Sequence, residues 1–258
     1  MSDAIFSMDE GTGDAGDAIV LVSGLGGMSS FWNPVIGVFK DRRRVIALDH
    51  PGVGRSTLEG RPSIEGIARA VLNVMDEKEI ERAHIVGHST GSLVAQALAL
   101  DSPKRVQSIV LSSGWAKPDK RFEDFFAYRK YVLAKLGGNA YDALTKLTAY
   151  PSEWYGRHLA ASEPLDFDAP SRIDVGMIEA RIDMLLTYSR RDELAAIKCP
   201  TLVIGAQDDY IIPFHHSLEL AELIPGATLR ELSGGHFAPV TRTDPWVSIL
   251  DQFLATTA

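Results

Sequence analysis

Ser89 lies in the pentapeptide Gly87-His88-Ser89-Thr90-Gly91, which fits the pattern Gly-x-Ser-x-Gly. The apolar pair Ile85-Val86 precedes it and a small-residue helical pattern over residues 92–100 follows, so the serine falls on a turn between a strand and a helix. A turn this sharp strains the serine backbone, and the flanking glycines remove side chains that would clash. The turn lifts the hydroxyl off the sheet and places it at the positive end of the helix. We therefore predict that Ser89 is a nucleophile.

A serine hydroxyl is a weak nucleophile and needs a base, which is in turn held by a carboxylate. His236 lies in a Gly-Gly-His loop just after the predicted strand 228–232, where open α/β sheets place their sites. The predicted strand 201–204 runs into Asp208 and Asp209, and either carboxylate could orient the imidazole. We choose Asp208 because it lies nearer to the end of the strand. The chain order serine, aspartate, histidine is that of one particular fold with a catalytic triad.

The oxyanion that forms when a serine attacks a carbonyl needs backbone N–H donors. We expect one from Thr90, directly after the nucleophile, and one from Leu25 in the segment Ser23-Gly24-Leu25-Gly26-Gly27. The glycines of this segment let the backbone approach the reacting group closely. The segment lacks the Gly-Lys-Ser/Thr ending of a P-loop, and its glycine spacing differs from a dinucleotide fingerprint. We predict no cofactor.

Other residues that could do chemistry are given structural roles. His88 is expected to pack away from the reacting centre. His215 and His216 begin a helix, and because adjacent residues do not share a helix face we predict no metal pair there, and no metal site elsewhere. Cys199 is the one cysteine, so the chain can form no internal disulfide, which fits a reducing compartment. It precedes Pro200 at the start of a strand and is interpreted as a small buried residue.

The elements that must position these residues alternate along the chain. Apolar runs without polar alternation predict strands that are covered on both faces. Such strands followed by helices indicate an α/β fold with a mostly parallel sheet and helices on both sides. The predicted strands are residues 18–22, 45–48, 85–86, 106–111, 201–204 and 228–232, and the predicted helices between them are residues 64–75, 92–100, 214–223 and 245–254.

The alternation stops between Trp115 and about residue 196. This region predicts helices only, over residues 121–136, 141–148 and 173–188, with a loop over 150–170 and a helix stop at Gly137-Gly138. Since most connections are short, an all-helical insertion of this length is typical of a functional lid. We therefore expect residues 1–114 and 197–258 to form the core, and residues 115–196 to form a helical lid.

Length and charge restrict the partners. The chain has 258 residues and a net charge of −8, and nucleic-acid binders usually present a basic surface. Arg42-Arg43-Arg44 is interpreted as a solvated turn. The start, Met1-Ser2-Asp3-Ala4, lacks the regions of a signal peptide, and no apolar run approaches the ~18 residues that span a bilayer. We expect a cytoplasmic protein with a small-molecule substrate and no nucleic-acid or membrane partner; the sequence leaves a homodimer open.

These segments together resemble an α/β-hydrolase over nearly the whole chain. "LVSGLGG" stands where that family usually has His-Gly-x-Gly, with Ser23 in place of the histidine, and "DHPGVGRS" (residues 49–56) is similar to the family loop Asp-x-x-Gly-x-Gly-x-Ser. "SGLGG", "SSGW", "YPSEWY" and the final "GGH" look most like the pyrimidine-utilisation aminoacrylate hydrolase group, and the 3-oxoadipate enol-lactonases share the general plan. The resemblance implies a small carboxylated substrate. The nucleophile of the aminoacrylate group is not always serine, so Ser89 favours an esterase or lactonase.

A lid that closes over Ser89 would supply the substrate contacts. Aromatic side chains of the insertion offer apolar walls, and arginines there could bind a carboxylate through two hydrogen bonds. The candidates are Gly24, Trp115, Phe126, Tyr128, Tyr150, Trp154 and Tyr155, with Arg129, Arg157 and Arg181. We predict a serine hydrolase of small esters, lactones or aminoacrylate-like acids. The alternative is a receptor or scaffold of the same fold with little or no turnover.

Overall fold

The computed structural model describes residues 3–12 and 17–257. Met1 and Ser2, on which part of the signal-peptide prediction rests, lie outside the described residues. Within the described chain, no helix combines the length and the apolar character that are needed to cross a membrane.

The strands form one sheet in the order β1-β3-β2-β4-β5-β6-β7. All neighbours pair in parallel except β1, which runs antiparallel to β3 at the edge. The strands are β1 (Ser7–Glu10), β2 (Ile19–Val22), β3 (Val45–Leu48), β4 (Ala83–His88), β5 (Val106–Ser112), β6 (Thr201–Ala206) and β7 (Thr228–Leu232). The six predicted strands are confirmed. The sequence does not predict β1, because its edge position leaves Asp9 and Glu10 exposed and no apolar run marks it.

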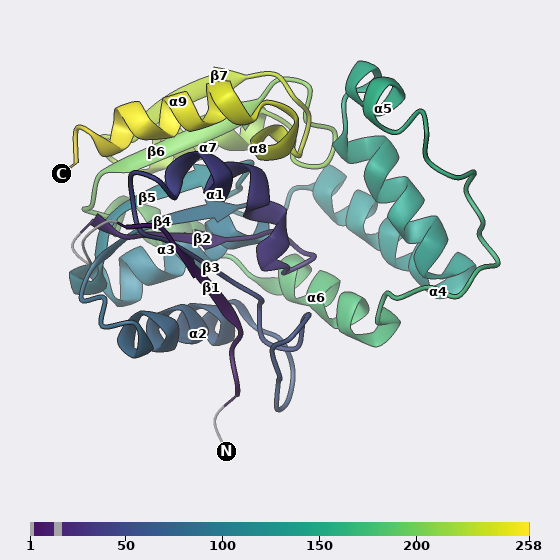
Figure 1. Ribbon diagram of the computed structural model, residues 1–258, viewed down its shortest axis with the longest axis horizontal. Coiled ribbons are helices and arrows are strands. Elements are labelled where there is room, and N and C mark those ends of the chain that lie inside the picture. Colours follow the sequence, from purple (N-terminus) through teal and green to yellow (C-terminus); the bar gives the residue numbers. More distant parts are fainter. Residues whose placement is uncertain (1–2, 13–16, 258) are drawn as a thin grey trace.

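Helices cover both faces of this sheet (Figure 1). The helices of the core are α1 (Asn33–Phe39), α2 (Ile64–Glu77), α3 (Thr90–Asp101), α7 (His215–Leu223), α8 (Ala238–Thr241) and α9 (Thr243–Leu254). Successive strand residues point to opposite faces, so Val20 and Ile46 pack with α2, α3 and α7, whereas Ile19 and Val45 pack with α1 and α9. The predicted α/β fold with a mostly parallel sheet is therefore confirmed.

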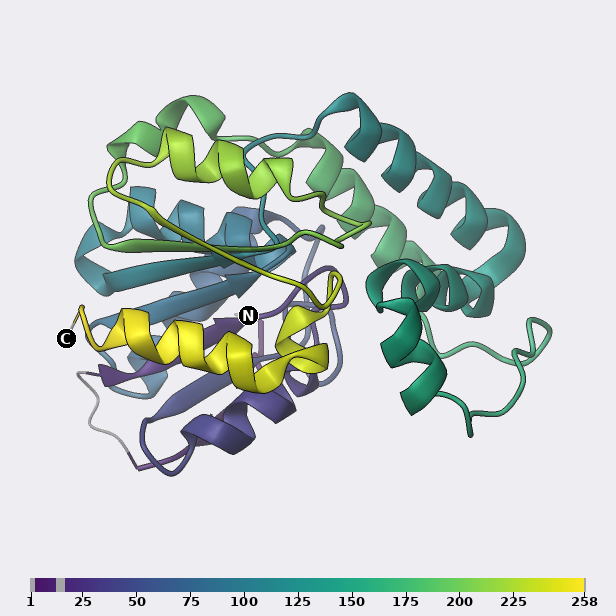
Figure 2. The same cartoon turned by 90° about the horizontal axis from the view of Figure 1, so that it is seen from above.

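Residues 115–196, called the insertion below, leave the sheet after β5 and return to it at β6. The insertion carries α4 (Lys120–Ala149), α5 (Ser152–His158) and α6 (Val175–Thr187), and it lies to one side of the sheet in both views (Figures 1 and 2). The predicted helix stop at Gly137-Gly138 is present as a break within α4, because Gly137 takes a non-helical φ of 82° before a second helical stretch begins. Glycine allows this angle since it has no side chain. α5 occupies part of the predicted loop.

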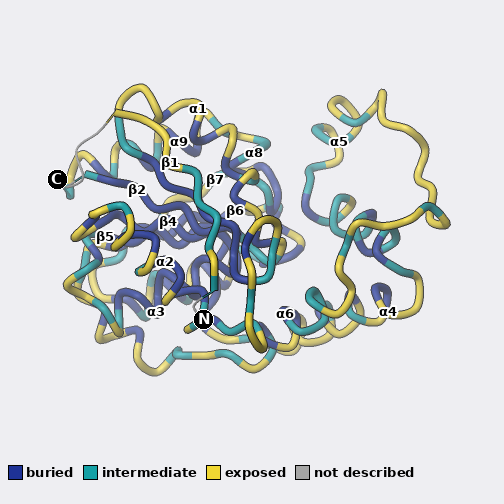
Figure 3. Tube along the Cα trace, turned by 60° about the horizontal axis from the view of Figure 1, so that its bottom comes forward, coloured by how far each residue is buried: buried dark blue, intermediate teal, exposed yellow. Residues whose placement is uncertain are grey.

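The two parts differ in burial. The central strands are buried along their whole length, whereas the stretch between α5 and α6 is mostly exposed (Figure 3). The triad candidates follow the carboxyl ends of β4, β6 and β7. Because parallel strands end at the same edge of the sheet, these segments meet on the side where β5 enters the insertion.

Candidate active site

The predicted turn at Ser89 is present between β4 and α3. Ser89 has φ 53° and ψ −118°, which is a strained conformation for a residue with a side chain. A Cβ at Gly87 would overlap the carbonyl oxygen of Gly91, and a Cβ at Gly91 would overlap that of Val22. The backbone N–H of Ser89 donates to Ser112 O (2.8 Å), which fixes the turn on β5. The strain therefore persists because the sheet and α3 hold the turn from both ends.

The choice of Asp208 as the partner of the imidazole is wrong. His236 Nδ1 lies 2.8 Å from Asp209 Oδ2, and both side chains are buried. The other carboxylate oxygen of Asp209 accepts the N–H groups of Ile211 (2.9 Å) and Ile212 (2.8 Å), so the carboxylate cannot swing away. Nearness to the strand end misleads here. The turn that closes on Ala206 O aims residue 209 inward and residue 208 toward the neighbouring loop.

Asp208 holds the loop that carries the histidine. Its Oδ1 accepts the N–H groups of Gly234 (2.8 Å) and Gly235 (3.0 Å), immediately before His236. Both glycines have positive φ, 137° and 66°, which is why the loop is built from glycine. The two adjacent aspartates therefore have separate roles. Asp209 orients the imidazole of His236, and Asp208 orients the backbone of the loop that carries it.

The imidazole of His236 lies beside the turn that carries Ser89. The ring of His88 is 4.9 Å from the ring of His236 and stacks on Phe31 on its other side. Burial lowers the pKa of His88 well below its usual value, and the nearby His236 adds to that effect. His88 is therefore a packing residue as predicted, but it packs beside the reacting centre rather than away from it. No hydrogen bond between Ser89 Oγ and His236 is present among the described residues. In ligand-free enzymes this contact is often long and tightens with substrate.

The glycine-rich segment after β2 faces the nucleophile. A Cβ built at Gly24 would lie 3.1 Å from Ser89 Cβ and 3.5 Å from Ser89 Oγ, so glycine permits this approach. The N–H of Leu25 has no acceptor in the described part of the chain. Thr90 is the first residue of α3, where helix geometry gives an N–H no acceptor within the helix. Neither predicted oxyanion donor therefore has an acceptor among the described residues, Thr90 beside Ser89 and Leu25 next to Gly24.

The loop of residues 49–56 supports that segment from behind. Asp49 is fully buried, and its Oδ1 accepts both the N–H (2.8 Å) and the hydroxyl (2.6 Å) of Ser29. The next residue, His50, donates its backbone N–H to Gly27 O (2.8 Å). The loop therefore fixes the end of the glycine-rich segment without contributing to the reacting centre.

Arg181 on α6, one of the arginines predicted to bind a substrate carboxylate, contacts the glycine-rich segment instead. It is fully buried, and its Nε donates to Leu25 O (2.7 Å) while Nη2 donates to His50 Nδ1 (2.7 Å). Burial lowers its pKa to about 10, so the guanidinium stays charged at neutral pH. Its Nη1 has no hydrogen-bond partner, and no carboxylate pairs with it among the described residues. A cation of the insertion is thus held against the oxyanion segment.

The predicted substrate contacts in the insertion have different fates. Trp115 is fully buried and packs at 4.9 Å from Phe122, so it is a core residue. Arg129 is buried and donates to Tyr141 OH (2.7 Å) and Thr145 Oγ1 (2.8 Å), which uses it inside the insertion. Tyr128 is 57% exposed on α4. Trp115 is thus used in core packing before α4 begins, whereas α4 directs Arg129 into the insertion and Tyr128 toward solvent.

Trp154 lines a groove between the insertion and the core. It stacks on Tyr150 (4.4 Å), whose ring lies 5.1 Å from Phe237, the residue after His236. The groove has a volume of about 450 Å³ and is lined by Pro151, Ser152, Glu153, Trp154, Arg157, His158, Asp208, Thr241 and Arg242. It adjoins the histidine loop through Asp208, although Ser89 and His236 do not line it. A second pocket, of about 280 Å³ beside the start of α2, lies apart from the triad candidates.

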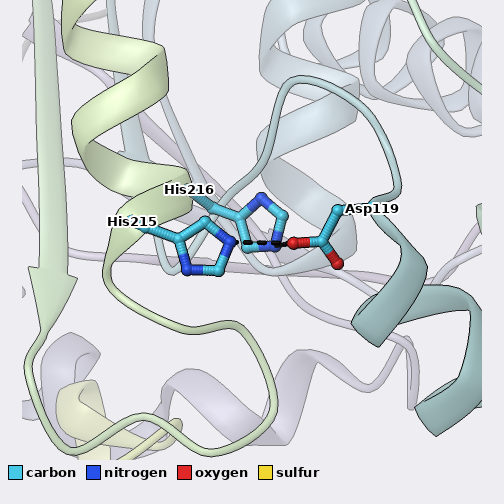
Figure 4. Close-up of side chains that lie close together, drawn as sticks. All are labelled: Asp119, His215 and His216. Carbon is cyan, nitrogen blue, oxygen red and sulfur yellow. Dashed lines mark hydrogen bonds and ion pairs between the residues drawn. The ribbon is translucent and has the colours of Figure 1, made fainter.

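The premise that adjacent residues do not share a helix face fails for His215 and His216. Their rings lie 4.2 Å apart, and both face the carboxylate of Asp119 (Figure 4). They are the first two residues of α7. Cys199 is half-buried rather than fully buried, and burial raises the pKa of its thiol to about 11, which disfavours the thiolate at neutral pH.

A strained serine turn, two free N–H groups and a buried aspartate–histidine pair at one edge of a parallel sheet define the α/β-hydrolases, a class of enzymes. The chain belongs to this family: the model described as alpha/beta hydrolase fold matches residues 17–243.

Similar proteins come from curated sequences and from solved structures. Relatives named "Putative carbamate hydrolase RutD" include one from Azorhizobium caulinodans, 36% identical over 87% of this chain and 85% of its own length. Another, from Variovorax paradoxus, is 36% identical over 93% of this chain and 92% of its own. The enol-lactonase from Burkholderia xenovorans LB400 superposes with a TM-score of 0.87 at 25% identity, covering 97% of this chain and 96% of that one. The protein is therefore a hydrolase of the α/β-hydrolase type that resembles these groups.

Proposed function

We propose that the protein is a serine hydrolase whose triad is Ser89, His236 and Asp209. Ser89 Oγ attacks a substrate carbonyl carbon while His236 takes the hydroxyl proton. Asp209 holds the imidazole in one tautomer and stabilises the imidazolium that forms. The N–H groups of Leu25 and Thr90 receive the oxyanion, and the leaving group departs with the proton from His236. Water then hydrolyses the acyl-enzyme by the same route.

One observation carries this proposal: the buried 2.8 Å contact between His236 Nδ1 and Asp209 Oδ2. A carboxylate at Nδ1 leaves Nε2 as the nitrogen that can take a proton, which is what a base for Ser89 requires. The N–H groups of Ile211 and Ile212 donate to the other carboxylate oxygen of Asp209 and so hold it in position for this contact.

The proposed substrates are small carboxylic esters, lactones and aminoacrylate-like acids. The enol-lactonase likeness supports a lactone, and the name of the RutD relatives supports a carbamate, whose leaving group is nitrogen. With a C–N substrate the same site could position a water molecule instead of forming an acyl-enzyme. We further propose that the insertion acts as a lid, because Tyr150 packs on Phe237 beside the catalytic histidine.

Turnover of p-nitrophenyl acetate, followed by a panel of short esters, lactones, carbamates and aminoacrylate, tests the proposal. We expect hydrolysis of at least one carbonyl substrate, and loss of that activity in Ser89→Ala. If the folded protein turns over none of the panel, a ligand receptor of the same fold is the better account. If Ser89→Ala keeps full activity, the serine has another role.

A further inference from the structure

The residues Asp119, His215 and His216 bring three potential metal ligands together from the insertion and the core (Figure 4). Asp119 precedes α4 as its N-cap, and the two histidines begin α7. Asp119 Oδ2 lies 2.8 Å from His215 Nε2 and 3.5 Å from His216 Nε2, and the three ligand atoms all lie within 4.8 Å of one another. This cluster takes no part in the triad chemistry.

His216 supplies the observation that points to a ligand. Its side chain is 2% exposed, yet neither ring nitrogen has a hydrogen-bond partner among the described residues. Buried polar atoms in native proteins almost always have a hydrogen-bond partner, so an unpaired buried ring calls for an explanation. A neutral imidazole carries a lone pair on one ring nitrogen, which is the group that binds a cation.

Asp119 is arranged to supply one oxygen. Its Oδ1 accepts the N–H of Phe122 (2.8 Å) and caps α4, whereas Oδ2 faces both histidines. Oδ2 lies at the positive end of α7, which begins at His215, so a carboxylate is favourably placed there.

The distances suit a zinc-type ion. Zinc binds histidine nitrogen and carboxylate oxygen at about 2.0–2.2 Å, which puts tetrahedral ligand atoms roughly 3.4 Å apart. Oδ2 and His216 Nε2 are already 3.5 Å apart. Oδ2 and His215 Nε2 are 2.8 Å apart, and a small rotation of His215, whose side chain is 55% exposed, brings its nitrogen to the same spacing. The exposed side of the site leaves a fourth position to water.

We propose that Asp119, His215 and His216 bind one Zn²⁺ or a similar late first-row ion that braces the start of the insertion against α7. The ion takes the place of the direct contact between Asp119 and His215. It binds Asp119 on the side of the insertion, and His215 and His216 on the side of the core. The site lies on elements that carry none of the triad residues, and it does not depend on the proposed hydrolase activity.

Isothermal titration calorimetry tests the site: Zn²⁺ is titrated into full-length protein from which metal has been removed with EDTA and the EDTA then dialysed away. We expect one ion per chain, with binding lost in Asp119→Asn, His215→Ala and His216→Ala. Asp119→Asn is the sharpest variant, because asparagine still caps α4 but cannot offer a carboxylate oxygen to the ion. Asp124→Asn on the same helix and His158→Ala, another exposed histidine, serve as matched controls that should bind normally.

A second measurement separates a lost ligand from a lost fold. Saturating Zn²⁺ should raise the Tm of the wild type and of Asp124→Asn, but leave that of Asp119→Asn unchanged, while the metal-free Tm values stay close together. Co²⁺ should give visible absorption bands in the wild type that Asp119→Asn lacks. Absence of stoichiometric binding, or equal binding by wild type and Asp119→Asn, overturns the proposal. Equal loss in the control variants would do the same.

Discussion

Asp209 uses its two carboxylate oxygens for different purposes. Oδ1 accepts two backbone N–H groups and Oδ2 faces His236 Nδ1, so neither the carboxylate nor the ring is free to turn. Asp208, one position earlier, has a different role from Asp209: it accepts backbone N–H groups of the loop that carries His236 and does not contact the imidazole among the described residues. The sequence narrows the acid to these two residues and cannot decide between them, because the turn geometry sets which one points inward.

Replacing either aspartate with asparagine separates the two roles. Asp209→Asn keeps an oxygen for Ile211 and Ile212 but presents an NH₂ to His236, which favours the wrong tautomer. We expect kcat to fall about 10⁴-fold, by analogy with protease triads. Asp208→Asn keeps its acceptor oxygen, and we expect a loss of less than about tenfold, the worth of one weakened hydrogen bond. Steady-state kinetics of both variants check this; the opposite ranking would return the triad to Asp208.

Ser89 and His236 should behave as a unit. Ser89→Ala and His236→Ala are expected to lower kcat by on the order of 10⁶-fold each, to nearly the same floor, and the double variant should fall no further. Circular dichroism of each variant controls for folding. A double variant that loses the product of the two single effects would show that the residues act independently.

At the scale of elements, the strands are predictable because both faces of the central ones are buried, which produces unbroken apolar runs such as β2 and β6. The Ser89 turn is predictable because glycine is required wherever a Cβ would strike neighbouring backbone. Arg181 is not predictable in the same way. Its burial depends on α6 packing over the glycine-rich segment, a long-range contact that leaves no local pattern.

Arg181 links α6 to the oxyanion segment, so its loss should affect catalysis as well as stability. In Arg181→Met, the Leu25 carbonyl and His50 Nδ1 lose their donors, at about 1–3 kcal/mol for each buried group. If the N–H of Leu25 moves with them, kcat should fall by up to about 10²–10³-fold, the worth of one oxyanion donor.

Arg181→Lys is the matched variant, since it keeps the charge and one donor and should recover part of kcat. Urea denaturation and steady-state kinetics on the same samples separate the two effects. A change in stability with kcat intact would limit Arg181 to a structural role.

For the whole molecule, several histidines are buried as neutral rings. Burial lowers the pKa of His50, His84, His88 and His216, and for His50 and His88 the shift is large. Below pH 6.5 the unfolded chain binds protons at these positions while the folded chain does not, so the free energy of unfolding falls as the pH falls.

His50 and His88 together should lower the free energy of unfolding by about 2–3 kcal/mol between pH 7.5 and 5.5. Urea denaturation at the two pH values measures this. The carboxyls of Asp9 and Asp119, whose pKa values are lowered, lose their contribution only at more acidic pH. Equal stability at pH 7.5 and 5.5 would mean that these rings take up protons in the folded state.

Covalent labelling locates the nucleophile in the intact protein. A fluorophosphonate probe reacts with a serine that is activated by a base, and peptide mass spectrometry identifies the modified residue. We expect one label per chain on the peptide that contains Ser89, none in Ser89→Ala, and much slower labelling in Asp209→Asn than in Asp208→Asn. A label on another serine, or wild-type protein that remains unlabelled, would contradict a triad of Ser89, His236 and Asp209.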